Sequence, residues 1–357
     1  MQGATRYQNL LEPQSLVSAF LQHPPLGFEA VQAISNVPAF ATRFNILTTI
    51  DPRVRRRVMA SPLYPLCRGL MSPLACLVGT TVTEYVPLPR CVAPLDLLRA
   101  IKTAYSQKYS LVIVKDIPQP SPLLDAPDIE YAAELLAACA DERFTVLDGQ
   151  ALAYLPLRFN SIEQYLSQRS RARRKDLRRK LRSGRSVKTT MLSTGDPHFL
   201  DDRFLAELYA LYANVYAQSD LHFDQLSPEF FRCILRDASS AGRVFVYRRN
   251  GLLIGFNLCY VYNRMLIDKY VGFLYPQSRD VNLYFVSWFE NLHYALEQHL
   301  THYVVGWTDP RIKRDLGAEF TFTRHAVYLR NPLLRIALRR LCHTFSSDRL
   351  WHDQVAV

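Results

Sequence analysis

One carboxylate stands in the middle of a mostly apolar stretch, MLIDKYVGF at residues 265–273. Burying an unpaired charge is costly, so Asp268 needs either a partner or a function at this position. A suitably tuned carboxylate can take a proton from an amine and so prepare the amine to attack an activated acyl group. Because strand side chains alternate between faces, we expect Asp268 and Tyr270 on one face and Lys269 and Val271 on the other. The alternative is a structural ion pair between Asp268 and Lys269 or a nearby arginine.

Two further polar groups have types that suit proton transfer or acceptor recognition. His222 and Asp224 lie two residues apart in the loop DLHFDQL, where a histidine can act as a base near neutral pH. The alternative for His222 is an exposed loop residue. Trp307 and Asp309 follow the apolar run HYVVG, and ligands of open α/β sheets gather at the carboxyl ends of strands. Asp309 could instead cap the helix that Pro310 begins.

The elements that must position these groups lie between residues 243 and 307. Asn250-Gly251 separates two apolar runs, and Asn263-Arg264 separates the second run from a third, which is the pattern of consecutive hairpins. A polar loop, a helical pattern over residues 281–300 and a last apolar strand follow. The sequence therefore predicts three antiparallel strands, a loop, a helix and one more strand.

The loop before that helix has the position of an anion site. The first backbone N–H groups of a helix have no internal partner and lie at the positive end of its dipole, so they can hold a phosphate or a carboxylate. Asp280 or Asn282 could cap this helix.

The order strand, strand, strand, loop, helix, strand resembles the core of the Gcn5-related N-acetyltransferase (GNAT) superfamily. In that superfamily the pyrophosphate of acyl-CoA lies on the loop, and a carboxylate on the third strand often serves as the base. The resemblance implies that Asp268 is the base. Tyr270, which we expect on the same face of the strand, is a further catalytic candidate. The resemblance also implies, by position alone, donor contacts from residues of the loop, namely Gln277, Ser278, Arg279 and Asn282. The usual Gln/Arg-x-x-Gly-x-Gly/Ala loop of the family is absent here.

A strongly basic segment precedes this core. Between Arg169 and Lys188 there are eleven Lys or Arg residues and one acid, Asp176. The segment could be a solvated arm, a helix on nucleic acid or anionic lipid, or a holder of substrate phosphates, for which Arg171 and Arg174 are candidates. No aromatic residue interrupts it where a base could stack, so binding of single-stranded nucleic acid is the weaker alternative.

This segment makes the resemblance more specific. The series SRARRKDLRRKLRS, VKTTMLS and TGDP before a GNAT core resembles the FemAB-like and CelD (BcsL)-like branch, over roughly residues 150–330. Members of this branch transfer acyl or aminoacyl groups to amines in cell-envelope or exopolysaccharide biosynthesis.

The 357 residues are more than one hydrophobic core usually serves, so we expect two domains. Helices alternate with short apolar strands in the first 160 residues, which indicates an α/β layer. The predicted fold class is a GNAT-type mixed sheet flanked by helices, with two such units in tandem and the N-terminal one degenerate. The predicted organisation is an N-terminal α/β domain (1–160), a basic helical segment (161–190), a GNAT-like domain (191–330), and a basic amphipathic helix with a tail (331–357).

Composition limits the location and the partners. The net charge of +11 indicates an anionic partner. Seven scattered cysteines without a Cys-x-x-Cys pair favour a reducing compartment and no metal site, and no apolar run is long enough to cross a bilayer. We expect a cytoplasmic protein. The apolar and basic residues after 331 allow peripheral contact with the inner membrane, although docking of that helix on its own domain is favoured.

The predicted function is N-acyl transfer from acyl-CoA, acetyl-CoA included, or from an acyl carrier protein, to an amine of a small molecule or an envelope precursor. The first alternative is a FemAB-type transferase that uses aminoacyl-tRNA and contacts it through the basic segment. The second alternative is a GNAT-fold binding module without catalysis. No Gly-x-Ser-x-Gly elbow is present, so a hydrolase triad is unsupported.

Overall fold

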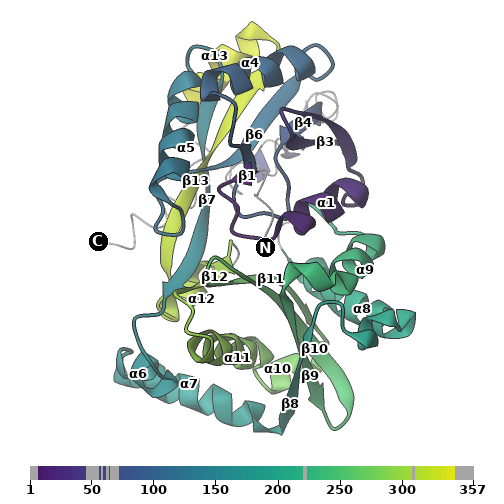
Figure 1. The fold of residues 1–357 in the computed structure, drawn as a ribbon, viewed down its shortest axis with the longest axis vertical. Coiled ribbons are helices and arrows are strands. Elements are labelled where there is room, and N and C mark those ends of the chain that lie inside the picture. The colour runs from purple at the N-terminus through teal and green to yellow at the C-terminus, as the bar shows by residue number, and fades with distance from the viewer. Residues whose placement is uncertain are drawn as a thin grey trace. The chain divides into compact units, whose positions relative to one another are not determined.

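The computed structural model describes residues 7–45, 56–57, 59–61, 64, 72–219, 223–307 and 310–341. These residues form two compact units (Figure 1). Unit 1 comprises Met1–Leu10, Phe20–Leu152 and Thr321–Val357, and unit 2 comprises Leu11–Ala19 and Ala153–Phe320. The catalytic candidates His222 and Asp309 lie outside the described residues.

Unit 2 contains the predicted core. Its strands, in sheet order, are β8 (Val187–Ser193), β9 (Gly242–Arg249), β10 (Leu252–Tyr262), β11 (Met265–Phe273), β12 (His302–Gly306) and the end of β7 (Thr145–Pro156). The pairs from β8 to β11 are antiparallel, β12 is parallel to β11, and the end of β7 is antiparallel to β12. The parallel pair requires a crossover connection, which α10 (Gln277–Asp280) and α11 (Leu283–Glu297) provide.

Both predicted hairpin turns are confirmed. Asn250 and Gly251 have φ of 51° and 80°, and Asn263 and Arg264 have φ of 46° and 58°. Positive φ at both central residues gives a turn whose twist matches that of the flanking strands. The predicted succession of three antiparallel strands, a loop, a helix and a last strand is therefore present.

Helices cover both faces of the sheet in unit 2 (Figure 1). On one face, α11 packs against the sheet, and α6 (Ile162–Ser167) and α7 (Arg171–Ser183) pack against α11. On the other face lie α8 (Asp202–Gln218) and α9 (Pro228–Arg236), of which α8 contacts β10 and β11. α12 (Pro310–Asp315) follows β12. A Cβ at Gly184 would lie 2.3 Å from Cγ2 of Val286, so a glycine is required where the end of α7 meets α11.

Unit 1 repeats the same succession of elements. Strands β2 (Glu29–Ile34), β3 (Val37–Arg43) and β4 (Leu74–Val78) are antiparallel, and β6 (Leu111–Pro118) is parallel to β4. Helix α4 (Pro94–Tyr105) connects β4 to β6, as α11 connects β11 to β12. β13 (Glu319–Leu329) pairs antiparallel with β6, as β7 pairs with β12. The predicted fold class, a mixed sheet with helices in two tandem units, is confirmed.

The remaining elements of unit 1 are α5 (Ala126–Ala138), α13 (Pro332–Leu341) and a small sheet of β1 (Tyr7–Gln8) with β5 (Leu88–Pro89). α1 (Gln14–Gln22) begins in unit 2 and ends in unit 1, and β7 and β13 each pass from one unit to the other. This division differs from the predicted domain boundaries. The basic α7 belongs to the core of unit 2 through Leu177, and residues from the start of the chain join the same unit.

Candidate active site

The parallel strands β11 and β12 stay paired over only three residues. Met265, Leu266 and Ile267 pair with His302, Tyr303 and Val304, and β11 then continues to Phe273 without a further residue pair on β12. Asp268 is the first residue beyond the last pair. The split between the strands thus begins at the predicted base.

Three side chains from three elements donate hydrogen bonds to the Asp268 carboxylate. Asn257 Nδ2 on β10 lies 2.9 Å from Oδ1, while Tyr303 OH on β12 and Asn291 Nδ2 on α11 lie 2.8 Å and 3.2 Å from Oδ2. Asn291 Nδ2 also lies 2.9 Å from the Tyr303 hydroxyl. A carboxylate surrounded by donors suits its acceptor-only, ionised form.

The partners of Asp268 are more deeply buried than Asp268 itself. Asn257, Asn291 and Tyr303 are buried, whereas Asp268 is partly exposed. Burial, followed by the nearby charge of Asp268, raises the pKa of Tyr303 well above its ordinary value. Tyr303 therefore keeps its proton and remains a donor at any physiological pH. The same two causes raise the pKa of the Cys259 thiol, which makes this cysteine a poor nucleophile.

A β-bulge at Lys269 corrects the prediction that Asp268 and Tyr270 share a face. Cys259 pairs with Asp268 while the preceding Leu258 pairs with Tyr270, so β11 holds one extra residue. Asp268 consequently reaches Asn291 on the α11 side. The Tyr270 ring instead packs against Phe230 and Phe231 of α9, with centroid distances of 6.1 and 5.5 Å.

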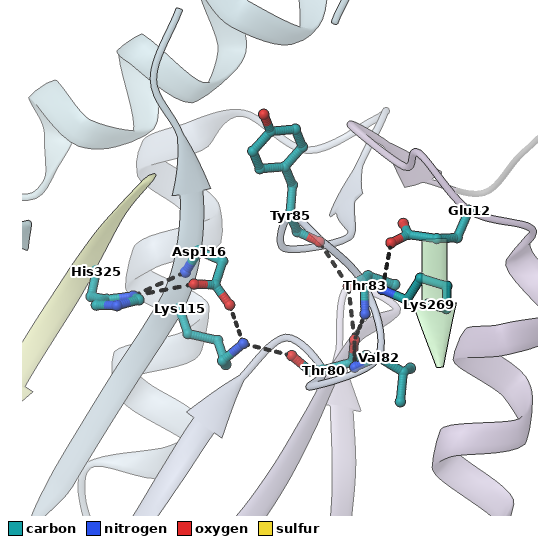
Figure 2. Close-up of polar contacts among 9 residues, drawn as sticks. All are labelled: Glu12, Thr80, Val82, Thr83, Tyr85, Lys115, Asp116, Lys269 and His325. Atoms are coloured by element: carbon teal, nitrogen blue, oxygen red, sulfur yellow. Dashed lines mark hydrogen bonds and ion pairs between the residues drawn. The ribbon is translucent and has the colours of Figure 1, made fainter. Parts of the chain in front are cut away.

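The extra residue, Lys269, forms a buried ion pair with the N-terminal segment of unit 2. Its Nζ lies 3.1 Å from Oε1 of Glu12, and the two side chains are 6% and 0% exposed (Figure 2). A buried charge pair contributes little net stability but is costly to break. Glu12 therefore fixes the bulge, and with it the position of Asp268, from a point more than two hundred residues away in sequence.

The predicted donor loop holds two buried polar groups without hydrogen-bond partners among the described residues. They are the hydroxyl of Ser278, a residue that is 3% exposed, and Oε1 of Gln277. Such groups cost free energy unless a ligand or water satisfies them. Asn282 stands at the N-cap of α11 in a left-handed conformation with no side-chain cap bond, so neither predicted cap residue covers this helix end. Arg279 is exposed and stacks on Tyr275 at 4.7 Å.

The basic helix α7 ends at this loop. Ser183 Oγ, the last side chain of α7, accepts a hydrogen bond from Asn282 Nδ2 at 2.9 Å and donates to the carbonyl oxygen of Val281 at 3.3 Å. Arg171 is exposed at the start of α7. Arg174 is half-buried and donates to the carbonyl oxygen of Ser167 at 3.4 Å.

The three hydrogen bonds to Asp268 come from residues other than the remaining substrate candidates, Asp224 and Trp307. Burial raises the pKa of Tyr270, and the charges of Tyr260, Tyr212 and Asp224 raise it further, with Asp224 the smallest of these effects. Trp307 is half-buried directly after β12.

Sequence reasoning missed Asn257, Asn291 and Tyr303. Asn257 interrupts the apolar strand LLIGFNLCYVY, and Asn291 lies on the apolar side of α11. A polar residue at a position that the pattern assigns to the core is the signal that could have found both asparagines.

Unit 1 closes the corresponding split with its own side chains (Figure 2). Beyond the last β4–β6 pair, Lys115 forms an ion pair with Asp116 and donates to the carbonyl oxygen of Thr80 at 2.8 Å. A Cβ at Gly79 would lie 3.2 Å from Cγ of Lys115, so the lysine stem covers the end of β4. Asp116 has a left-handed φ of 55°, and its N–H donates to Nδ1 of His325 at 3.0 Å.

Residues 171–314 match the family model of the acetyltransferase (GNAT) domain. The chain contains a GNAT domain. It begins at α7, includes β8 to β12 and ends within α12, so it lies inside unit 2 and contains Asp268, its three donors and the donor loop.

Solved structures share the fold over most of this chain, the GNAT domain included. L-PGS from Bacillus licheniformis is 13% identical, with 94% of this chain and 98% of that chain covered and a TM-score of 0.51. The C-terminal domain of a protein assigned as a lysylphosphatidylglycerol synthetase from Agrobacterium fabrum is 14% identical, with 87% of each chain covered and a TM-score of 0.52. FemX is 10% identical, with 90% and 97% covered and a TM-score of 0.50. The predicted GNAT superfamily is confirmed by the family model over residues 171–314, and FemX shares the fold that the resemblance to the FemAB-like branch predicts.

No curated protein sequence matches the chain. Within the described residues, no helix is both long and apolar enough to cross a membrane. Nor do the described parts of the chain bring three or more His, Cys, Asp or Glu side chains close enough together to hold a metal ion.

Proposed function

We propose that this protein transfers an acyl group from an activated carrier to an amine, with Asp268 as the base. The observation that carries the proposal is the position of the Asp268 carboxylate, held by Asn257, Asn291 and Tyr303 at the residue where β11 and β12 separate. The GNAT domain supports acyl transfer in general.

The phosphates of the donor bind at the start of α11, where Ser278 and Gln277 hold unsatisfied polar atoms and the helix dipole favours an anion. The acyl group lies in the split between β11 and β12. The amine loses a proton to Asp268 and attacks the acyl carbonyl. The new N–C bond forms as the C–S bond of a thioester, or the C–O bond of an aminoacyl ester, breaks, and the leaving sulfur or oxygen takes up a proton.

The first test combines activity with stability. The protein is incubated with acetyl-CoA and a panel of amines that includes aminated lipids and envelope precursors, and products are detected by mass spectrometry. Asp268→Asn keeps the size of the side chain but removes its basicity, so we expect the rate to fall about 100-fold or more. We expect only a small change in Tm.

Glu207→Gln provides the control, because this exposed carboxylate on α8 pairs with Arg203 and forms no hydrogen bond with the three donors of Asp268. We expect it to leave the rate unchanged. A loss of stability in Asp268→Asn as large as its loss of rate would assign Asp268 to a structural role.

A specific surface feature favours aminoacyl-tRNA as the alternative donor. Arg171, Lys175, Arg178 and Arg182 are all exposed and follow one another at steps of four, three and four residues. They therefore form one stripe along α7, about 17 Å long. This basic stripe leads to the donor loop through the contact between Ser183 and Asn282. An isolated pyrophosphate requires no such length of positive charge, whereas the backbone of an RNA carrier does.

The two donors are distinguished by salt and by ligand. If the carrier is RNA, the affinity of the protein for aminoacyl-tRNA falls steeply as the salt concentration rises. We then expect the slope of log K against log salt to become shallower by about one per removed cation in the triple variant Arg171→Gln/Lys175→Gln/Arg182→Gln. Arg203→Gln removes an exposed arginine of α8 and serves as the control. If the carrier is CoA, acetyl-CoA raises the Tm in proportion to the logarithm of its concentration, and the stripe variant retains most of that rise.

A further inference from the structure

Helix α13 exposes an apolar face. Leu333, Leu334 and Ile336 are 74%, 55% and 51% exposed, and they are three of the ten large apolar side chains that are exposed among the described residues. Leu333, Ile336 and Ala337 are three or four residues apart and share one side of the helix. Exposed apolar area in one patch is unfavourable in water and marks an interaction surface.

The opposite side of α13 holds the helix on unit 1. The guanidinium of Arg335 lies 4.8 Å from the ring centroid of Tyr328 on β13 and donates to the carbonyl oxygen of Arg330 at 3.3 Å. Asn331 Oδ1 accepts from the backbone N–H of Leu333 at 2.9 Å and so caps the helix start. Leu338 is half-buried. The helix is therefore fixed by one side while the side with Leu333 and Ile336 faces outward.

The charged residues of α13 itself have one sign. Between residues 330 and 341 there are four arginines (Arg330, Arg335, Arg339 and Arg340) and no acid. Arg339 and Arg340 are exposed, and Arg340 lies seven residues after Leu333, on the apolar side. An apolar face bordered by arginines is the pattern of a helix that lies in a membrane interface, where anionic headgroups attract the cations.

We propose that α13 docks the protein on the surface of an anionic membrane, with Leu333 and Ile336 among the acyl chains and Arg339 and Arg340 at the lipid phosphates. Charge complementarity selects this partner over a second copy of the chain. A symmetric pair of copies would bring the same arginines face to face, and like charges repel.

The full-length protein is mixed with vesicles of phosphatidylcholine alone, or of phosphatidylcholine with phosphatidylglycerol, and the bound fraction is measured by flotation. We expect binding to the anionic vesicles and weak binding to the neutral ones. Leu333→Ser/Ile336→Ser should lower the affinity for anionic vesicles about tenfold or more. Arg339→Gln/Arg340→Gln should lower it as well and reduce its dependence on salt.

Leu200→Ser is the matched control, because Leu200 lies in unit 2 and is 71% exposed. We expect it to bind vesicles like the parent protein, and all variants to keep the parent Tm, since each replaced side chain is exposed. Equal binding by Leu333→Ser/Ile336→Ser and the parent would overturn the proposal, as would failure of the parent to bind anionic vesicles. Light scattering that shows a dimer dispersed by Leu333→Ser/Ile336→Ser, without vesicle binding, would assign the face to a second copy instead.

Discussion

The hydroxyl of Tyr303 donates a 2.8 Å hydrogen bond to Oδ2 of Asp268, one residue beyond the last pair that joins β11 to β12. This bond links the two strands at the place where their backbones stop pairing. It therefore stabilises the ionised form of the proposed base and limits how the split opens.

Tyr303→Phe removes this donor and leaves the ring in place. We expect kcat/KM to fall about 10- to 100-fold, the equivalent of the 1.5–3 kcal/mol typical of a hydrogen bond to a charged group. The acid limb of the rate profile should also move to higher pH, because the ionised carboxylate loses a donor. Tyr294→Phe removes another hydroxyl, which accepts a hydrogen bond from Arg243, and should leave the profile unshifted. If Tyr303→Phe leaves the acid limb of the rate profile unchanged, Tyr303 does not influence the ionisation of the proposed base.

Ser278→Ala tests whether the donor loop binds a ligand. The Ser278 hydroxyl is buried without a hydrogen-bond partner among the described residues, so its removal should leave the free protein equally stable or about 1 kcal/mol more stable. If the donor supplies the missing partner, the same change should reduce the rise in Tm that the donor produces. A variant that binds the donor as tightly as the parent would show that the hydroxyl takes no part in the site.

His325 should make the stability of unit 1 depend on pH. Burial, with a smaller contribution from Lys115, lowers the pKa of His325 below its ordinary value of 6.5, against an opposing effect of Asp116. The neutral ring is the form that accepts the Asp116 N–H. As pH falls below 6.5, His325 binds a proton in the unfolded chain before it does so in the folded protein. The unfolding free energy therefore decreases as pH falls from 6.5 towards the lower pKa that His325 has in the folded state. We expect parent and His325→Gln to differ in the slope of unfolding free energy against pH over this interval, and parallel curves would contradict the prediction.

Gly184→Ala should lower the unfolding free energy by about 1–3 kcal/mol, because the new Cβ would meet Cγ2 of Val286 at 2.3 Å. Val286→Ala removes the obstructing methyl groups. The double variant should therefore be less destabilised than the sum of the two single variants. If the losses of unfolding free energy in the two single variants simply add in the double variant, Gly184 is required for a reason other than the close approach of α7 to α11.

Local signals were sufficient for much of unit 2. Asn-Gly and Asn-Arg pairs between apolar runs fixed the two hairpins, because two-residue turns with positive φ accept few residue types. The amphipathic pattern before residue 300 located α11, and the order of these elements led to the correct superfamily.

The site depended on contacts that local patterns do not contain. The bulge at Lys269 arises from the register with β10, and one extra residue reverses the face of every later side chain on the strand. Glu12 reaches Lys269 from the other end of the chain, and Asn257 and Asn291 meet Asp268 from two different elements. Strand alternation alone therefore placed Tyr270 on the wrong face and left the partners of Asp268 unidentified.

Strand β13 passes from unit 2 into unit 1, and this has a consequence for the synthesis of the chain. Unit 1 contains most of the first 152 residues, yet the strand that pairs with β6 is β13, which the ribosome makes only after all of unit 2. Until then β6 keeps an open edge of unpaired backbone groups, which invites pairing with other chains. The N-terminal half of this protein therefore cannot complete its sheet during its own synthesis and must wait for residue 329.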